Sequence, residues 1–321
     1  MELFIFLLQC FLVPAVAPFA VGLIRKVKAR MQNRVGASVL QPYFDLYKLF
    51  HKDEVISRDA SWIFRFAPYL IFSVTLVIGA SVPLVTTMAP ALFEGSAFPF
   101  SFFAVGDFIT LVYLFALTTF FLALAGMDAG SGFGGFGSSR EMTMAALAEG
   151  GLFFSLLVAS VIAQSGNIMT MIESLQVTPF QAYIPLVIAF IAFFIALLAE
   201  NSRFPVDNPA THLELTMIHE AMILEYSGKR LALIEWASFS KLLIFVALGA
   251  NVFFPWGVAT SFLPEMLGMA TLLFVLKAGA ILVAIAFIES TMAKFRIFRV
   301  PDLLFTSFVL SVIALSVTIT L

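Results

Sequence analysis

Long apolar stretches separated by shorter charged segments run along the whole chain. A transmembrane helix needs about 20 consecutive, mostly apolar residues. The stretches that meet this condition lie at roughly residues 3–24, 63–88, 106–127, 141–164, 180–199, 236–256, 267–290 and 301–320. The pattern predicts an all-α polytopic membrane protein, a single membrane domain over residues 1–321 with about eight transmembrane helices.

The positions of lysine and arginine predict the orientation of this domain. All but two of the 18 Lys and Arg residues, Lys241 and Lys277, fall in or beside the odd-numbered loops, at about residues 25–62, 128–140, 200–235 and 291–300. Loops rich in Lys and Arg remain in the cytoplasm. We therefore expect these four loops to be cytoplasmic, both termini to lie outside, and the chain to cross the inner, or cytoplasmic, membrane of the cell.

Composition excludes several classes of protein. Hydrophobic residues make up 61% of the 321 residues and charged residues 12%, and the mean hydropathy is +1.03, which is too apolar for a soluble protein. The net charge of −2 gives no basis for nucleic-acid binding. The single cysteine, Cys10, cannot by itself hold an iron–sulfur cluster or a thiolate zinc site. We predict no metal and no cofactor bound by this chain, so that electron-transfer metals belong to a partner.

Two glutamates lie inside or at the end of predicted spans. Glu149 lies about two turns into the fourth span, where an ionisable residue is a functional candidate by default. We expect it to take up and release protons. Glu200 closes the fifth span, and an ion pair with Arg203, three residues later, is the structural alternative to a proton-handling role.

Glycines precede the fourth span in a G-x-G-x-x-G pattern formed by Gly132, Gly134 and Gly137. A dinucleotide site would need a strand before this pattern, whereas a membrane span precedes it. We expect a flexible loop that ends in a helix start, with Ser138 as N-cap and Glu141 completing a capping box. Proton handling is the alternative role for Glu141.

The fifth loop contains the charged stretch "HLELTMIHEAMILEYSG". A continuous helix over His212–Tyr226 would place Glu214 and Glu225 on one stripe, three turns apart. A zinc-protease site is excluded because "HEAMI" lacks the second histidine of H-E-x-x-H. The structural alternative is an amphipathic surface helix with solvated charges, after a turn at Asp207.

Basic residues within the spans and in the first loop allow further predictions about ion pairs and an interfacial helix. Lys277 lies mid-span and needs a carboxylate, a carbonyl or water as its partner, and Glu289 closes the same helix. Lys241 begins the sixth span, from which a lysine can extend to the membrane surface. The stretch "KVKARMQNRVGASVLQPYFDLYKLF" is basic and then amphipathic, which indicates an interfacial helix on the inner face.

The order of these motifs resembles the membrane-arm subunit called H in bacterial respiratory complex I, which is subunit 1 in mitochondria. It also resembles the counterparts of that subunit in membrane-bound [NiFe] hydrogenases and formate hydrogenlyase. The matching segments are "RMQNRVGASVLQPYFDLYKLF", "DFITLVYLFAL", "GSSREMT" with Glu149, and "AENSRFPVDNPATHLEL" followed by "EYSG". The stretch "GMDAGSGFGGFGSSRE" favours the hydrogenase branch.

The resemblance implies a non-catalytic membrane subunit that joins soluble redox subunits to antiporter-like membrane subunits in the lipid bilayer. Iron–sulfur clusters, and a nickel–iron centre in the hydrogenase branch, would lie in the partners. The implied proton pathway comprises Glu141, Glu149, Glu200, Asp207, Glu214, Glu225, Lys277 and Glu289. The implied interface with the soluble arm comprises Arg30, Arg34, Gln41, Asp45, Lys48, Arg203, His219 and Tyr226.

The chain departs from the family pattern in the fifth loop. Ala210 and His212 stand where the family usually has acids, and the stretch from Glu214 to "EYSG" is about three residues longer, around His219 and Glu220. Two alternative functions stay open: a stand-alone cation/proton transporter, and the quinone-site subunit of a quinone-reducing complex.

Overall fold

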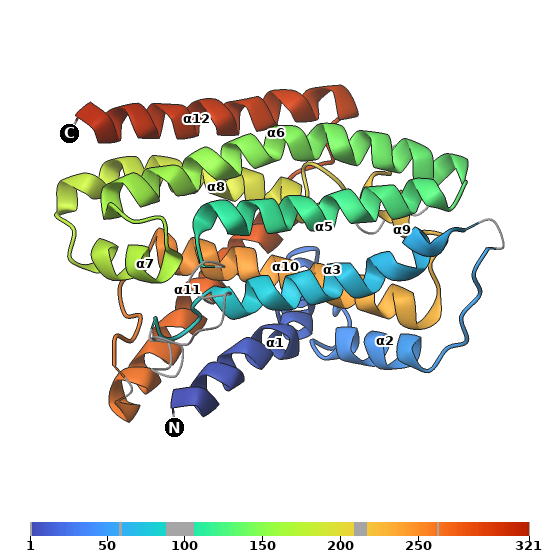
Figure 1. The fold of residues 1–321 in the computed structure, drawn as a ribbon, viewed down its shortest axis with the longest axis horizontal. Helices are drawn as coiled ribbons and strands as arrows, with labels where there is room; N and C mark the ends of the chain where they lie inside the picture. Colours follow the sequence, from blue (N-terminus) through green and yellow to red (C-terminus); the bar gives the residue numbers. More distant parts are fainter. Residues whose placement is uncertain (1, 58–59, 88–105, 209–216, 262, 321) are drawn as a thin grey trace.

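The computed structural model describes residues 2–57, 60–87, 106–208, 217–261 and 263–320 and consists almost entirely of helices (Figure 1). The helices are α1 (Glu2–Met31), α2 (Gln41–Phe50), α3 (Trp62–Ser81), α5 (Phe108–Asp128), α6 (Gly132–Ala163), α7 (Ile168–Gln176), α8 (Tyr183–Glu200), α9 (His219–Ile223), α10 (Gly228–Val252), α11 (Pro264–Thr291) and α12 (Val300–Thr320). Short 3-10 turns at Phe180–Ala182 and Ile297–Arg299 precede α8 and α12.

Within the described residues, seven helices are long and apolar enough to cross a membrane. They are α3, α5, α6, α8, α10, α11 and α12 with its preceding turn, and each covers one predicted span. The prediction of an all-α polytopic membrane protein is thus confirmed. The predicted first span lies in α1, a further long helix that is not among these seven.

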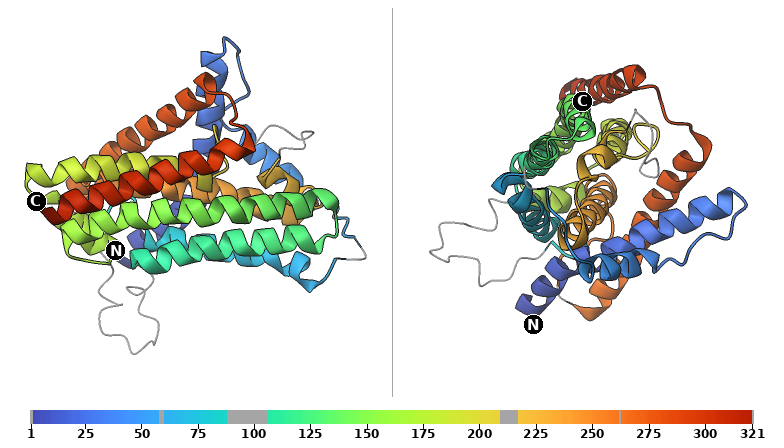
Figure 2. Two further views of the ribbon diagram at one scale, coloured as in Figure 1. Left: turned by 90° about the horizontal axis from the view of Figure 1, so that it is seen from above. Right: turned by 90° about the vertical axis from the view of Figure 1, so that its right-hand side faces the viewer.

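The long helices form a bundle in which α6 packs against α5, α8 and α12, while α10 packs against α1, α3 and α11 (Figures 1 and 2). Seen along the bundle, α11 lies apart from α12 (Figure 2, right). Of the seven candidate spans in the described chain, α10 is the most buried and α12 the least. The bundle therefore has its centre at α10.

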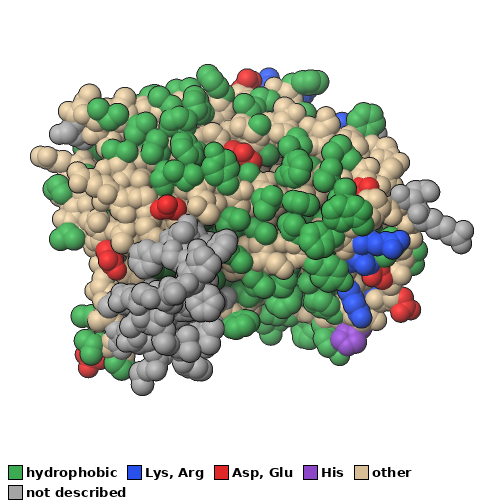
Figure 3. All heavy atoms as spheres, viewed as in Figure 1, with side chains coloured by type: hydrophobic (Ala, Val, Ile, Leu, Met, Phe, Trp, Pro, Cys, Tyr) green, Lys and Arg blue, Asp and Glu red, His purple; other side chains and the backbone are tan. Residues whose placement is uncertain are grey.

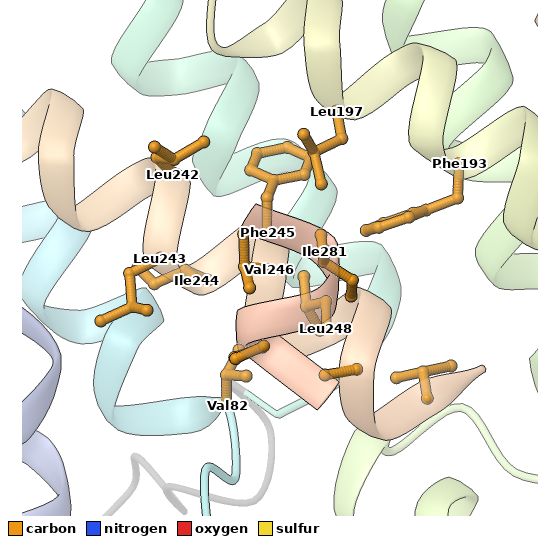
Figure 4. Packing of buried hydrophobic residues seen from close by; sticks show 14 of the residues in the cluster. Val82, Phe193, Leu197, Leu242, Leu243, Ile244, Phe245, Val246, Leu248 and Ile281 are labelled. Atoms are coloured by element: carbon orange, nitrogen blue, oxygen red, sulfur yellow. The ribbon is translucent and has the colours of Figure 1, made fainter. Parts of the chain in front are cut away.

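The core is built from large apolar side chains around α10. Phe245 lies against Phe193 of α8, with ring centroids 6.0 Å apart, and Ile281 of α11 belongs to the same cluster (Figure 4). Hydrophobic side chains also cover much of the long side of the molecule (Figure 3), as a lipid-facing surface requires.

Two predicted boundaries are wrong for identifiable reasons. The second span ends at Ser81 and not at residue 88, because Val85 and Thr87 instead exchange backbone hydrogen bonds with Ala259. The predicted loop at 128–140 is mostly helix, since α6 begins at Gly132 with Ser131 as its N-cap. The predicted N-cap, Ser138, is inside α6 and donates to the carbonyl oxygen of Ala123 on α5.

The glycines before the fourth span allow two helices to approach closely. A β-carbon at Gly134 would overlap the carbonyl oxygen of Gly126 on α5, and one at Gly137 would lie 2.8 Å from the Ala221 β-carbon on α9. The prediction of a flexible loop is therefore wrong here, because these glycines form a packed contact between α5, α6 and α9.

The predicted continuous helix over His212–Tyr226 is also wrong where the structure describes it. Helical structure covers only His219–Ile223. It starts where the carboxylate of Asp207 accepts the backbone N–H of His219, at 3.1 Å. The helix ends at Ile223, where the chain turns and brings Tyr226 into the protein interior. Glu214 lies outside the described residues. The amphipathic character of α2 is confirmed, with Pro42 and Leu46 buried.

Candidate functional site

A buried ion pair between Glu200 and Lys241 lies at the centre of the polar interior. Glu200 is the last residue of α8 and only 8% exposed. Its Oε2 accepts a hydrogen bond from Lys241 Nζ at 2.9 Å. The ammonium also lies 3.4 Å from Thr119 Oγ1 and 5.8 Å from the centroid of the Phe115 ring. Polar and aromatic groups thus replace the water that Lys241 loses on burial.

A cavity of about 40 Å³ borders this pair, which exceeds the roughly 10–15 Å³ that a cavity needs to hold a water molecule. It is lined by Glu141, His219, Glu200 and Lys241, among others. Glu200 Oε1 and Asn201 Oδ1 are buried without a hydrogen-bond partner in the described chain. Leaving such an atom unsatisfied costs about 1–3 kcal/mol, so this cavity is suited to hold water.

A second cavity, of about 10 Å³, joins Asp207 to the same carboxylates. Glu141 and Glu200 line both cavities, and Asp207 lines only the second. Asp207 is 2% exposed. Its Oδ1 accepts a hydrogen bond from Lys294 Nζ at 2.7 Å. The two cavities therefore connect three carboxylates that α6, α8 and the loop after α8 contribute.

Glu289, near the end of α11, forms a separate cluster of charges. Lys28 and Arg203 each approach one of its oxygens to 3.1 Å. The alternative of an ion pair between Glu200 and Arg203 is not the arrangement in the described chain, because Arg203 pairs with Glu289 of α11 and Glu200 pairs with Lys241. One lysine and one arginine surround one carboxylate, so the cluster has a net positive charge.

The other predicted pathway residues lie apart from the cavities. Glu149 is half-buried on α6, about 12 Å from Glu141 along the helix, and lines neither cavity. Glu225 is exposed. Lys277 lies in the middle of α11 and donates to oxygens of Asn251, Phe254 and Trp256, which confirms the expectation of a carbonyl partner.

The predicted interface residues divide into two groups. Arg30, Arg34 and Lys48 are exposed, and Gln41 donates to Asp45 at 2.9 Å on α2. In contrast, Arg203 and His219 are directed into this chain's own polar interior, towards Glu289 and the first cavity. Among the predicted interface residues, the exposed ones, Arg30, Arg34 and Lys48, are thus accessible to a partner.

Tyr226 anchors the fifth loop to the first turn of α3. Its ring stacks on Phe64 with centroids 4.0 Å apart, and its hydroxyl donates to the carbonyl oxygen of Phe64 at 2.9 Å. Burial raises the pKa of Tyr226. Next to it, the Ser227 hydroxyl accepts from the backbone N–H of Val55 and donates to its carbonyl oxygen, at 3.0 and 3.1 Å.

Two neighbouring groups of α9 have perturbed acidity. Burial lowers the pKa of His219 to about 4, so that the ring is neutral at pH 7. Burial, with the nearby charges of Glu235 and Asp207, raises the pKa of Glu220 to about 7. Glu220 therefore changes its protonation state near physiological pH, at the edge of the region that holds the cavities.

Lys241 is the site residue that sequence reasoning missed. The apolar pattern places it at the start of a span, whereas α10 begins at Gly228, so that Lys241 lies near the middle of the helix. The stretch "EYSGKRLALIEWASFSK" contains the signal for the true start of this helix. Ser227 is the N-cap of α10, which therefore begins well before Lys241.

A family model described as NADH dehydrogenase matches residues 3–320. The chain belongs to this family. It is 34% identical to formate hydrogenlyase subunit 4 of Escherichia coli K12 over 302 residues, which cover 94% of each chain. It is also 34% identical to hydrogenase-4 component C of the same organism, over 96% of this chain and 93% of the relative.

Two further similarities extend to respiratory complexes. The H-type subunit of NADH-quinone oxidoreductase from Rubrobacter xylanophilus is 30% identical over 87% of this chain and 82% of its own length. Among solved structures, a chain of the membrane-bound sulfane sulfur reductase, an archaeal respiratory membrane complex, shares the fold with a TM-score of 0.79 at 20% identity. The alignment covers 99% of this chain and all of that one. The resemblance to the complex I subunit and its hydrogenase counterparts is confirmed.

Proposed function

We propose that this chain is the membrane-anchoring and proton-coupling subunit of a hydrogenase-type or complex I-type respiratory complex. It would link a soluble redox arm to antiporter-like membrane subunits through a chain of buried carboxylates. Iron–sulfur clusters, and a nickel–iron centre if the complex is a hydrogenase, would be held by those partners. Family membership and the hydrogenase-type names of two relatives support this assignment.

The observation that carries the coupling role is the pair of carboxylates that share two cavities and one lysine. Glu141 and Glu200 line both cavities, and Lys241 contacts Glu200. Two ionised carboxylates in an apolar interior repel each other, and a single ammonium compensates only one of them. A proton bound to either carboxylate therefore favours ionisation of the other, so that the proton can move between them.

Charges at the predicted cytoplasmic end of the bundle would drive this movement. Asp207 and Glu289, each paired with a lysine, belong to the end of the chain's polar interior that faces the predicted cytoplasmic loops. A change of charge in the redox arm would alter the electrostatic potential at Asp207 and shift the proton towards Glu200. Glu149 is the next carboxylate deeper along α6, and Glu225 and Glu214 would belong to the entrance.

Replacement of Glu200 by Gln in the native complex tests this proposal. The amide keeps the shape of the side chain and can still accept a hydrogen bond from Lys241, so assembly should be retained. Redox-driven proton translocation into vesicles should fall by about a hundredfold or more, the lower end of what one proton-transfer group contributes. Translocation and redox turnover are measured in the same vesicles. Glu149→Gln is the second variant, and we expect the same direction of change.

The matched control is Glu265→Gln. Glu265 is an exposed glutamate in the first turn of α11 and lines neither cavity. Its replacement should leave translocation unchanged. Normal proton translocation by Glu200→Gln would refute the proposed pathway, and cation transport by the isolated chain in liposomes would favour a stand-alone transporter.

A further inference from the structure

The C-terminal end of α10 presents three oxygen atoms to one point. Asn251 Oδ1, the Phe254 carbonyl and the Trp256 carbonyl lie 3.0, 2.8 and 3.1 Å from Lys277 Nζ. Two of the three belong to the backbone after α10 has ended at Val252. The three oxygens converge because the chain turns after α10, where Pro255 prevents the helix from continuing.

The three oxygens match a primary ammonium ion. An ammonium on a lysine has three N–H donors and no acceptor, and each donor here has one oxygen. A neutral amine would direct its lone pair at one of these oxygens. The C-terminal end of a helix also carries partial negative charge, which favours a cation. Within the described chain no carboxylate forms an ion pair with Lys277, and the three oxygens that contact its ammonium there are neutral.

The same asparagine also contacts the segment that follows α3. The Asn251 side-chain amide donates to the carbonyls of Pro83 and Leu84, at 2.8 and 3.0 Å, in the non-helical segment after α3. Asn251 and Lys277 thus join the ends of α3 and α10 to the middle of α11.

Lys277 lies far from the carboxylates at the other end of α11. It is 12 residues before Glu289 on this helix, a distance of about 18 Å along the axis. An open apolar groove of about 380 Å³ lies beside it, between Phe190, Phe194 and Phe254 on one side and Ala280 and Ala284 on the other. Lys277 is itself one of the residues that line this groove.

We propose that the oxygens of Asn251, Phe254 and Trp256 form a binding site for a primary ammonium ion, which Lys277 fills as a cation tethered to α11. The three acceptors around Lys277 favour its charged form over a neutral amine. We therefore expect Lys277 to hold helices together and not to relay protons, in contrast to the role that the family resemblance implies for it. This inference does not depend on the proposed function.

The test is Lys277→Ala in the full-length chain, purified within its complex, with and without ethylammonium chloride. Loss of the ammonium should lower Tm by roughly 5 °C or more, since a charged group with three hydrogen bonds is removed. Millimolar ethylammonium should recover most of the loss in a saturable manner. Tetramethylammonium, which has the same charge and no N–H donor, should not. The wild type should respond to neither.

Lys26→Ala is the matched control, because Lys26 donates to a single carbonyl, that of Val35 at 2.8 Å, and its loss should leave no ammonium site. Equal effects of the two ammonium ions on Lys277→Ala, no effect of either, or an unchanged Tm would each overturn the proposal. If Lys277→Ala does not accumulate, Lys277→Arg and Lys277→Gln decide: accumulation of Arg but not Gln supports a required cation, and equal accumulation refutes it.

Discussion

Single side chains acquired their roles here from partners that lie far away in the sequence. Glu289 was recognisable as an acid at the end of a span, yet Lys28, one of its partners, lies 261 residues earlier. Asp207 similarly pairs with Lys294, 87 residues away. The apolar surroundings of such acids can be predicted from the sequence, since they follow from neighbouring residues. Their ion-pair partners cannot, because these depend on how separate helices pack.

His219 and Glu220 give opposite contributions to the pH dependence of stability. The pKa of His219 falls from 6.5 to about 4 on folding, so the unfolded chain binds more protons between these values and stability rises with pH there. The pKa of Glu220 rises from 4.5 to about 7, so the folded chain binds more protons and stability falls with pH across that range. The two slopes oppose each other between pH 4.5 and 6.5.

Glu220→Gln should therefore expose the contribution of His219. We expect Tm of the variant to rise with pH up to about pH 6.5, and more steeply than in the wild type, when unfolding is followed between pH 5 and 8. His219→Gln should show the reverse, a Tm that falls as the pH rises towards 7. Parallel profiles for the wild type and both variants would contradict these assignments.

At the scale of the helix, the amino-acid pattern predicts the elements more reliably than their ends. In the part of the chain that the structure describes, seven predicted spans have a helix of sufficient length and hydropathy. The errors lie where tertiary contact overrides local signals. Gly132–Arg140 has the glycine content of a loop but is helical, because Gly134 and Gly137 allow α6 to contact α5 and α9. Hydrophobic periodicity does not report such contacts.

The adjacent glycines of α6 allow a matched test of this packing. Gly134→Ala should destabilise the protein, since the new β-carbon would overlap the Gly126 carbonyl oxygen, whereas a β-carbon at Gly135 meets nothing within 4 Å. Gly135→Ala should be neutral or stabilising, by up to about 1 kcal/mol from helix propensity. The measurement is Tm of both variants, and equal values would show that the α5–α6 contact tolerates a side chain.

For the whole molecule, the distribution of Lys and Arg predicts a direction across the membrane. The prediction places the segment between α7 and α8 outside and the segment after α2 in the cytoplasm. Both segments carry an exposed valine, Val177 at 85% and Val55 at 77%. Figure 1 places α7 at the end of the bundle that also carries the C-terminus.

Cysteine labelling tests this orientation in a Cys10→Ser background. A membrane-impermeant maleimide added to intact spheroplasts should label Val177→Cys, while Val55→Cys should react only after the membrane is opened. The opposite result would reverse the orientation, and labelling of both from outside would contradict the alternation of the loops.

The mutual hydrogen bonds between Val55 and Ser227 have a consequence for biosynthesis. The two residues are 172 positions apart, and synthesis proceeds at about 5–20 residues per second, so roughly 9–35 s pass between their emergence from the ribosome. During that interval the segment after α2 has no partner for these backbone groups, and the Phe64 ring lacks the tyrosine that covers it. The segment after α2 can therefore take up its final contacts only after more than two thirds of the protein has been translated.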